Sequence, residues 1–578
     1  MNRKTGDKNF AQSAAMLVAG TLTVKAVSML FKIPVSNLLG ATGYACFSGA
    51  YELFNLLAVI ALAGFPVAIS KLVAENCALG RYRDNRKIFS LGKKFFLATG
   101  LVWMTAMILG AKRFAAMIPN PGAELSIICL SPCVLTCCMM SAYRGYYQGM
   151  QNMYPTCVSQ IIEAVTKLIF GLGFCRLTLF LTSREYQRRG TVLGKVFAAK
   201  EQASSAMAQL ASAGAVFGVT LSTAAGLIYL VRTWKTQGDG ITDRQLMYAP
   251  KPQPSAALLR KIMAVGIPVC LGSLAVDLSG VIDLMTVTGG LAHLMETSPQ
   301  ALLELYQGKI PQIEILNQSV HNYLYGAYSG KAMVIANLIP ALTAGIAVSA
   351  LPAVAESFAK GNRDNTADSI ELVLRLTAAV CIPAGMGVSA LAEESCVLFF
   401  GDGQEISLAV PLLKICGIAA VFVALTASLT SLLQAVGMVM LPVKLLLIGS
   451  GIKWVMNYFL VEIPQINMKA AALSSLVCYF FITVMSIAAL KRQVGNLRLF
   501  SSFAVPSLAG GMCAFCARQV QDVLPAQSRF GVLISVFVGV VVYLMGLLVM
   551  GGIRKEEIMI LPGGEKMAKI LEKYQFLG

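Results

Sequence analysis

The stretch KLVAENCALGRYRDN, Lys71–Asn85, decides the fold, because a related stretch, PAVAESFAKGNRDN, follows it far downstream at Pro352–Asn365. In both stretches an apolar run ends in a short polar and basic segment with the same order of residue types. Asp84 and Asp364 occupy equivalent places and are 280 positions apart. A fixed separation of this kind indicates an internal repeat.

A second pair of segments has nearly the same separation. QGMQNMYP with its downstream Lys167 parallels QAVGMVMLP with Lys453, and the two lysines are 286 positions apart. Two markers with nearly one period predict a duplicated unit of six helices. Since six is an even number, both copies have the same orientation in a membrane, and parallel repeats are a transporter architecture.

The composition indicates a membrane protein. Of the 578 residues, 56% are hydrophobic and only 13% are charged, whereas soluble domains carry about 25% charged residues. Apolar runs of the roughly 20 residues that cross a bilayer recur along nearly the whole chain. We therefore predict an all-α polytopic membrane protein with about fourteen transmembrane helices, at 11–38, 44–72, 89–110, 124–143, 155–181, 207–231, 260–288, 331–357, 369–392, 407–435, 440–461, 468–490, 501–520 and 530–550.

Lysine and arginine predict the orientation, since cytoplasmic loops are enriched in them. The N-terminus, the second connection, the sixth connection and the C-terminal tail are all basic, so both termini are predicted to be cytoplasmic. The first helix is long and has no cleavage motif, which indicates a retained helix rather than a signal peptide. The segment 182–206 disagrees, because it carries five basic residues but is predicted outside. Either it is a tolerated insert or the helices on each side of it are misplaced.

The repeat and the charge pattern together predict the domain organisation. The predicted parts are an N-terminal six-helix lobe at 1–231, a cytoplasmic linker at 232–259, a C-terminal six-helix lobe at 260–490, two additional helices within 491–550 and a cytoplasmic tail at 551–578. The net charge of +18 is spread over the loops. Because it is not gathered in one domain with aromatic platforms, a nucleic-acid partner is not expected.

Three stretches carry a resemblance to a known family: GFPVAISKLVAENCALGRYRDN, YRGYYQGMQNMYPTCVSQIIE and GIPVCLGSLAVDLSGVIDLMTV. They resemble the stage V sporulation protein B branch of polysaccharide biosynthesis proteins, which is similar to MurJ-type lipid II flippases within the multidrug, oligosaccharidyl-lipid and polysaccharide exporter superfamily. The resemblance implies two pseudo-symmetric lobes in a V shape in the bacterial cytoplasmic membrane. It also implies alternating access for an undecaprenyl-diphosphate-linked precursor of peptidoglycan or another wall polysaccharide, made in sporulation or in growth.

Lysines within apolar runs are the candidate substrate-binding residues. Lys25 and Lys32 are seven positions apart, which places them on one face of the first helix. A lysine at the centre of a span costs about 2.5–3.5 kcal/mol on insertion scales and therefore usually faces an interior or wet cavity, although one near a helix end can instead reach the interface. By resemblance Lys25 replaces a cavity arginine of the flippases, and Lys331 lies near another basic position. A third basic position is lost, since LLAVIALAG contains no charge.

Acidic residues within the spans have two readings. Asp277 and Asp283 point to different faces of the seventh helix, and either of them could bind a coupling cation or proton or could pair with a lysine. Glu163 and Lys167 are at positions i and i+4, the spacing of an ion pair. We predict a structural role for that pair.

Other chemistry is weakly represented. The cysteine groups CLSPCVLTCC and CAFC lie in apolar runs without His or acidic neighbours, so packing is favoured over metal binding. His293 and His321 both fall in the connection 289–330, where short amphipathic helices are expected, so a buried histidine relay is not expected. We predict no catalytic residues, no metal and no cofactor, because paired carboxylates and a catalytic domain are missing.

Three functions remain open. The first is a flippase for a polyprenyl-diphosphate-linked sugar, with membrane lipids around it. The second is a cation-coupled multidrug exporter, which would need an acidic, aromatic cavity, whereas only 8% of the residues are aromatic and the first helix is basic. The third is a non-transporting scaffold, whose partners would be cell-wall synthesis enzymes. A nucleotide-binding motif of the P-loop type does not occur in the sequence.

Overall fold

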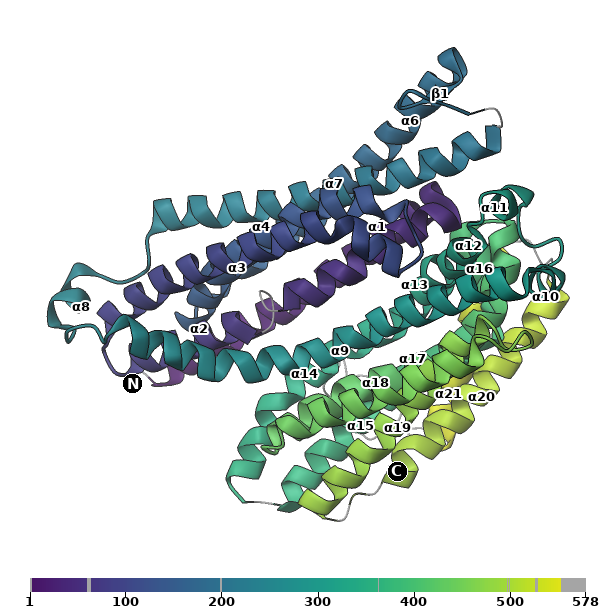
Figure 1. The fold of residues 1–578 in the computed structure, drawn as a ribbon. Coiled ribbons are helices and arrows are strands. Elements are labelled where there is room, and N and C mark those ends of the chain that lie inside the picture. The colour runs from purple at the N-terminus through teal and green to yellow at the C-terminus, as the bar shows by residue number, and fades with distance from the viewer. Residues whose placement is uncertain are drawn as a thin grey trace. The chain divides into compact units, whose positions relative to one another are not determined.

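The protein is a bundle of long helices in a computed structural model that describes residues 3–59, 64–197, 200–361, 363–495, 497, 499–524 and 529–551. The predicted tail, 551–578, lies outside these residues except for Gly551. In the first half of the chain the elements are α1 (Arg3–Val59), α2 (Phe65–Ala78), α3 (Tyr82–Met117), α4 (Ala123–Gly149), α5 (Tyr154–Thr166), the π-helical turn η2 (Lys167–Gly171), α6 (Leu172–Arg189), strands β1 (Thr191–Val192) and β2 (Lys195–Val196), α7 (Lys200–Gln237), α8 (Asp243–Tyr248) and α9 (Ser255–Thr297) (Figure 1). In the second half they are α10 (Pro299–Leu305), α11 (Gln312–Leu316), α12 (Val320–Ala327), the π-helical turn η3 (Tyr328–Ala332), α13 (Met333–Ala336), α14 (Leu338–Ala359), α15 (Arg363–Ala390), α16 (Ala392–Phe400), α17 (Gln404–Ala435), α18 (Met440–Leu460), α19 (Lys469–Val494), α20 (Leu499–Val523) and α21 (Arg529–Val549).

The predicted all-α membrane class is confirmed. Among the described residues, 11 helices are long and apolar enough to cross a membrane, and each overlaps a predicted span. Of the three other predicted spans, 11–38 lies within α1 and 501–520 lies within α20. The third, 44–72, was predicted as one helix, but its described residues belong to the end of α1 and the start of α2. The protein is therefore a multi-pass membrane protein, and the count of fourteen stays a prediction.

The chain forms two compact units. The first contains Met1–Gly330 and Asn457–Asn467, and the second contains Lys331–Met456 and Met468–Gly578. This division follows contacts, whereas the predicted lobes follow the sequence repeat, so the lobe boundaries at 1–231 and 260–490 stay a prediction.

The first two predicted helices run into each other at Gly40. The backbone there has φ 61° and ψ −173°, so α1 is two helices joined by a kink without a loop. Glycine suits this position, because a residue with a side chain rarely adopts that φ value. The second helix of α1 ends at Val59, and α2 follows from Phe65 after the residues 60–63 that are not described.

A glycine pair lets α4 approach α2 closely. Gly145 and Gly149 are four positions apart in the RGYYQG stretch of α4. A Cβ on Gly145 would lie 2.7 Å from the carbonyl oxygen of Pro66, and one on Gly149 would lie 2.6 Å from Cβ of Val73. This is the small-xxx-small packing that membrane helices use where apolar burial alone gives little driving force.

Hydroxyl groups join the central helices of each unit. In the first unit α4 packs between α3 and α7, and the hydroxyls of Thr136 and Thr223 are 2.7 Å apart. In the second unit α17 packs between α15 and α19, and the hydroxyls of Thr426 and Thr483 are 3.3 Å apart. The same chain order of packed helices thus recurs, which supports the predicted repeat.

The segment 182–206 contains the end of α6, a short hairpin and the start of α7. Continuous helices flank it, Tyr154–Arg189 before and Lys200–Gln237 after. Between them β1 and β2 form an antiparallel hairpin that pairs Thr191 with Val196. The Glu185 carboxylate accepts hydrogen bonds from the Thr191 hydroxyl at 3.0 Å and from the Gly194 amide at 3.1 Å. Of the two alternatives, the tolerated insert is the one that this geometry favours.

The connection 289–330 contains the expected short helices, α10, α11 and α12, although α9 continues to Thr297 before they begin. Of its two histidines, His293 is exposed and His321 is buried, and the expectation of no buried histidine relay stays a prediction. His321 in α12 is only 8% exposed, and its Nε2 lies 2.6 Å from the carbonyl oxygen of Pro119. The sequence places His321 in a connection but does not show that this connection folds back onto the 117–123 turn.

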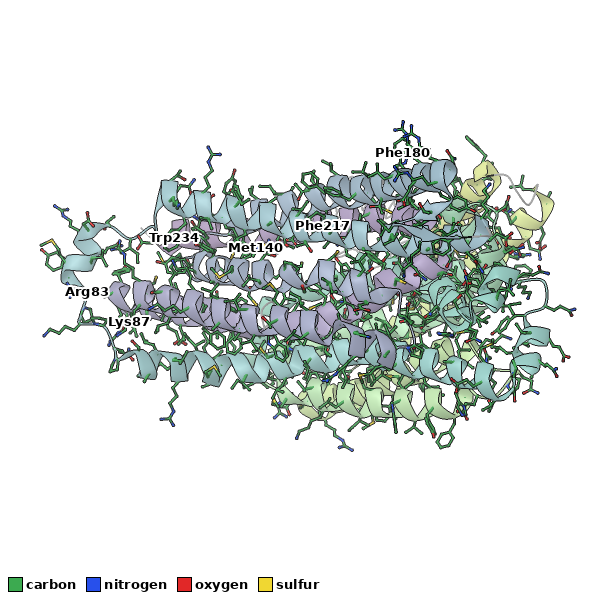
Figure 2. The ribbon with its side chains drawn as sticks, turned by 45° about the horizontal axis from the view of Figure 1, so that its top comes forward. Arg83, Lys87, Met140, Phe180, Phe217 and Trp234 are labelled. Atoms are coloured by element: carbon green, nitrogen blue, oxygen red, sulfur yellow. The ribbon has the colours of Figure 1, made fainter. Side chains whose placement is uncertain are left out.

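One end of the first unit is basic and cross-linked by polar contacts. Arg86 pairs with Asp239, and the Lys87 ammonium donates to the carbonyl of Gln253 at 2.7 Å. The predicted linker is therefore tied to the α2–α3 turn. Figure 2 shows Arg83 and Lys87 at this end and Phe180 at the other, and in Figure 1 α8 and β1 likewise lie at opposite ends of the long helices.

Candidate functional site

A charged cluster lies in the first unit where α1, α4, α5 and η2 pack together. It consists of Lys32 and Glu52 from α1, Arg144 from α4, Glu163 from α5 and Lys167 from η2. We call these five residues the charged cluster. Because all of them come from helices that are otherwise apolar, they are the kind of intramembrane ionisable groups that mark a functional site.

The π-helical turn presents Lys167. Lys167 opens η2, in which one extra residue is accommodated in the helix ladder, and such turns are frequent at functional sites. Its ammonium nitrogen lies 5.2 Å from the ring centroid of Phe31 and 5.3 Å from that of Tyr51. Both rings are within the reach of a cation–π interaction. Gly171 closes the turn against Phe31, because a Cβ on it would lie 2.4 Å from the ring.

Lys32 is partly buried beside Lys167. It interacts electrostatically with Lys167, which opposes its charge, and with Glu52, which favours it. Glu52 in turn packs against α9, where a Cβ on Gly280 would lie 2.5 Å from its Oε2. Two ammonium groups within electrostatic range repel each other, and an anion bound between them would relieve that repulsion.

Glu163 pairs with Arg144 and not directly with Lys167. The Nη2 of Arg144 lies 3.0 Å from Oε2 of Glu163, and its Nε donates to the Ser159 hydroxyl at 3.0 Å. Lys167 still interacts electrostatically with Glu163. The predicted Glu163–Lys167 pair is thus a longer-range attraction, and Arg144 is the direct partner.

The Arg144–Glu163 pair gives a testable coupling energy. We expect Arg144→Met and Glu163→Gln each to lower the free energy of unfolding, and the double variant to lower it by less than the sum. The difference should be about 1.5–3 kcal/mol, the contribution of a hydrogen bond to a charged group. Denaturation of the four purified proteins in one detergent measures it, and strictly additive losses would contradict the pairing.

The other two predicted basic residues are Lys25 and Lys331, and the structure describes the side chain of Lys331 alone of the two. Lys25 lies in α1, and its side chain is outside the described residues. Lys331 lies in the π-helical turn η3, and the second unit begins at this residue. Its side chain is buried. Its ammonium nitrogen is 3.4 Å from Oε2 of Glu405 and 4.5 Å from the Phe400 ring centroid. Both described π-helical turns therefore carry a lysine, which the sequence pattern alone does not reveal.

The two acidic candidates on α9 differ in their surroundings. Asp283 is buried, and its carboxylate accepts a hydrogen bond from the Asn457 amide at 2.9 Å. That amide also donates to the Thr286 hydroxyl at 3.0 Å. Asp277 is half-buried, and the part of the chain that the structure describes shows no hydrogen bond or ion pair to it. The two carboxylates thus do not form one paired site.

Oxidised or metal-bound cysteines are not found among the described residues. All 15 cysteines are free thiols there, and the closest contact between two of them joins Cys133 and Cys137 at 3.9 Å along one helix face. Groups of three or more metal-ligating side chains are not found in the described ranges either.

Two family profiles match different parts of the chain. The profile described as polysaccharide biosynthesis protein matches residues 10–199, and the one described as lipid II flippase MurJ matches residues 327–552. Lipid II flippase MurJ of Bacillus subtilis (strain 168) is 26% identical over 83% of this chain and 82% of its own length. Stage V sporulation protein B of the same organism is 21% identical over 96% and 98%. The chain is similar to both along most of its length.

Solved structures agree with this assignment at the level of the fold. Lipid II flippase MurJ in an inward closed conformation has a TM-score of 0.59 at 12% identity, over 92% of this chain and 98% of the other. An inward-facing multidrug resistance MATE transporter of the MOP superfamily also has a TM-score of 0.59, at 13% identity over 83% and 99%. The resemblance stated from the sequence motifs is confirmed, and the chain has the fold of these two solved structures.

Sequence reasoning found only part of the charged cluster. Glu163 and Lys167 were assigned to a structural pair, and Glu52 and Arg144 were not among the predicted site residues. One signal was available: Arg144, Glu163 and Lys167 are charges near or within the apolar runs 124–143 and 155–181. Charges so placed require partners, and the three could have been considered as one set.

Proposed function

We propose that the protein is a flippase for a lipid-linked cell-wall precursor, and that its substrate is an undecaprenyl-diphosphate-linked oligosaccharide similar to lipid II. We propose further that it works by alternating access in the bacterial cytoplasmic membrane with both termini in the cytoplasm. One observation carries the proposal: a π-helical turn holds Lys167 beside Lys32 within apolar helices of a chain similar to lipid II flippase MurJ.

In this proposal the lysines bind the diphosphate. The charged cluster contains three basic and two acidic side chains, so an anion is favoured over a cation. Lysine is a compact point charge that suits phosphate oxygens without the bidentate geometry of arginine. We propose Lys32 and Lys167 as the contacts of the first unit and retain Lys25 and Lys331 as predicted contacts.

Two energy sources are proposed for transport, the membrane potential and a coupling cation or proton. Moving a diphosphate outward is favoured by an inside-negative potential at about 2.3 kcal/mol per charge per 100 mV. We propose Asp283, whose carboxylate lies with the Asn457 amide and Thr286 hydroxyl, and Asp277 as the groups that bind a coupling cation or proton. Oxygen-rich sets of this kind suit hard cations.

The alternative functions are less well supported. A multidrug exporter of cations shares the fold, but it would need an excess of acidic groups, and the charged cluster has an excess of basic ones. A scaffold for cell-wall synthesis enzymes needs no charges within the spans. A scaffold function would leave unexplained the free-energy cost of placing Lys32 and Lys167 within apolar helices.

The proposal is tested by reconstitution. The full-length protein is placed in liposomes with fluorescent lipid II in one leaflet, a polyprenyl monophosphate in a second preparation and a lipophilic cationic dye in a third. We expect protein-dependent movement of lipid II that an inside-negative potential accelerates, and no movement of the dye. Dye transport without lipid II transport would replace the flippase by the exporter, and transport of neither would favour the scaffold.

A further inference from the structure

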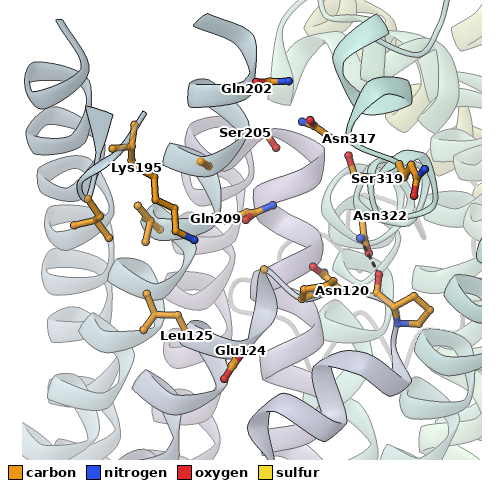
Figure 3. A pocket seen from close by; sticks show the side chains of 18 of the residues that line it. Asn120, Glu124, Leu125, Lys195, Gln202, Ser205, Gln209, Asn317, Ser319 and Asn322 are labelled. Atoms are coloured by element: carbon orange, nitrogen blue, oxygen red, sulfur yellow. Dashed lines mark hydrogen bonds between the residues drawn. The ribbon is translucent and has the colours of Figure 1, made fainter. Parts of the chain in front are cut away.

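A polar pocket lies in the first unit, at the end opposite the basic end. Its volume is about 970 Å³, at the upper end of the roughly 300–1,000 Å³ of ligand pockets. Three segments form it: the 116–128 stretch at the α3–α4 turn, the 192–210 stretch with the hairpin, and residues 317–322 before and within α12 (Figure 3). The insert at 182–206 and the connection 289–330 therefore contribute to one pocket.

The lining is rich in neutral hydrogen-bonding groups. Side-chain amides and hydroxyls surround the space, contributed by Asn120, Gln202, Ser205, Gln209, Asn317, Gln318, Ser319 and Asn322. Figure 3 labels all of these side chains except Gln318, and it shows the labelled ones on elements that face one another across the pocket. The charged residues of the lining are Lys195 and Glu124. Because their charges are opposite, the lining has no net charge. A lining of this kind favours an uncharged polar ligand over an anion such as diphosphate.

Two lining side chains, His321 and Asn322, are buried, and each has one polar atom without a hydrogen-bond partner among the described residues. His321 and Asn322 are 8% and 5% exposed, and both donate to the carbonyl oxygen of Pro119, at 2.6 Å and 3.1 Å. Because that carbonyl only accepts, His321 carries its proton on Nε2. This leaves Nδ1 of His321 and Oδ1 of Asn322 as acceptors, and neither has a hydrogen-bond partner among the described residues. A buried unpaired polar atom costs about 1–3 kcal/mol, and both of these side chains belong to the pocket lining.

Apolar side chains complete the pocket. Leu125, Ile128 and Phe197 lie among the polar groups and offer flat contact surface. Sugar rings combine hydroxyl donors, acceptors and patches of C–H groups, and an N-acetyl substituent adds an amide. Side-chain amides of Asn and Gln present a donor and an acceptor together, so they match such substituents.

We infer that this pocket binds an N-acetylated sugar of the translocated oligosaccharide. The identity of the ligand rests on the proposed function, whereas the pocket does not. Since basic loops are cytoplasmic, the basic end of the unit faces the cytoplasm and the pocket faces the outer medium. The pocket is therefore a binding site on the exit side, separate from the charged cluster, and it holds the sugar headgroup after the diphosphate has left the lysines.

The experiment uses N,N′-diacetylchitobiose as a soluble probe of the purified full-length protein. Binding is measured by saturation-transfer NMR and isothermal titration. We expect saturable binding with a millimolar dissociation constant. Gln209→Leu and Asn317→Ala should each weaken it at least fivefold. Gly122→Leu should abolish it, because a Cβ on Gly122 already lies 2.6 Å from the Gln209 side chain. The matched control is Gln434→Leu, an exposed glutamine of the second unit, which should bind as the unaltered protein does.

Each other outcome has a meaning. Absence of saturable binding, or binding that the three pocket variants leave unchanged, overturns the inference. Stronger binding of an uncharged alanine dipeptide than of the sugar would assign the pocket to peptides, and binding of inorganic pyrophosphate would show an anion site. Sugar binding without lipid II movement would overturn the proposed flippase function and support the proposed sugar-binding pocket. Lipid II movement without sugar binding would support the flippase function and overturn the sugar-binding pocket.

Discussion

Replacing Lys167 with methionine is expected to reduce lipid II movement in the reconstituted assay at least tenfold while the protein still folds. Lys167 has two aromatic rings beside its ammonium group and lies in electrostatic range of Lys32. A loss of one charged contact to the diphosphate costs about 1.5–3 kcal/mol, and each 1.36 kcal/mol is a factor of ten in rate. Methionine is also unbranched and only one atom shorter than lysine, so it keeps most of the packing and removes the ammonium group with its charge and its hydrogen-bond donors.

Two further variants separate charge from packing. Lys167→Arg should retain part of the activity, because the positive charge remains although the planar group fits the two rings differently. Lys94→Met is the matched control, since Lys94 is an exposed lysine on α3. It should move lipid II as fast as the unaltered protein. Full activity of Lys167→Met, with normal expression and monodispersity, would remove Lys167 from the proposed site.

The fold was predictable because it depends on composition and period. Apolar runs of membrane-spanning length located 11 helices, and the motifs gave the family. The junction at Gly40 was not predictable to the same degree, because the sequence shows two apolar runs but not that a single left-handed glycine joins them without a loop. The free-energy cost of placing a lysine within a membrane span identified Lys32 as a candidate from the sequence alone.

The charged cluster was only partly predictable, for a geometric reason. The i and i+4 spacing of Glu163 and Lys167 predicts a direct contact in a regular α-helix, but Lys167 opens a π-helical turn. Moreover, Arg144 from another helix reaches Glu163 at 3.0 Å. Contacts between helices depend on how α4 packs against α5, which a single sequence does not state. The polar pocket was out of reach for the same reason, since its three segments are far apart along the chain.

The repeated stretch that identifies the fold makes a second large prediction, because its two copies have different surroundings. Asp84 is 1% exposed. Its carboxylate accepts from Arg81 Nε at 2.7 Å and from the backbone amide and side-chain amide of Gln253 at 2.7 and 3.3 Å. Asp364, the equivalent residue of the second copy, is exposed. One copy of the motif therefore fastens the linker, while the other ends in solvent.

We expect Asp84→Ala to loosen the linker and Asp364→Ala to change little. Removing the carboxylate leaves Arg81 and the Gln253 amide without their partner, at a cost of about 3 kcal/mol for hydrogen bonds to a charged group. Opening of the 238–255 backbone should then become roughly a hundredfold more frequent. Hydrogen–deuterium exchange of peptides from that segment measures it, with peptides of the 360–370 turn as the comparison for Asp364→Ala. If the 238–255 segment exchanged equally fast in the two variants, Asp84 would not be needed to hold the linker. The Arg86–Asp239 pair and the Lys87 hydrogen bond would then be sufficient.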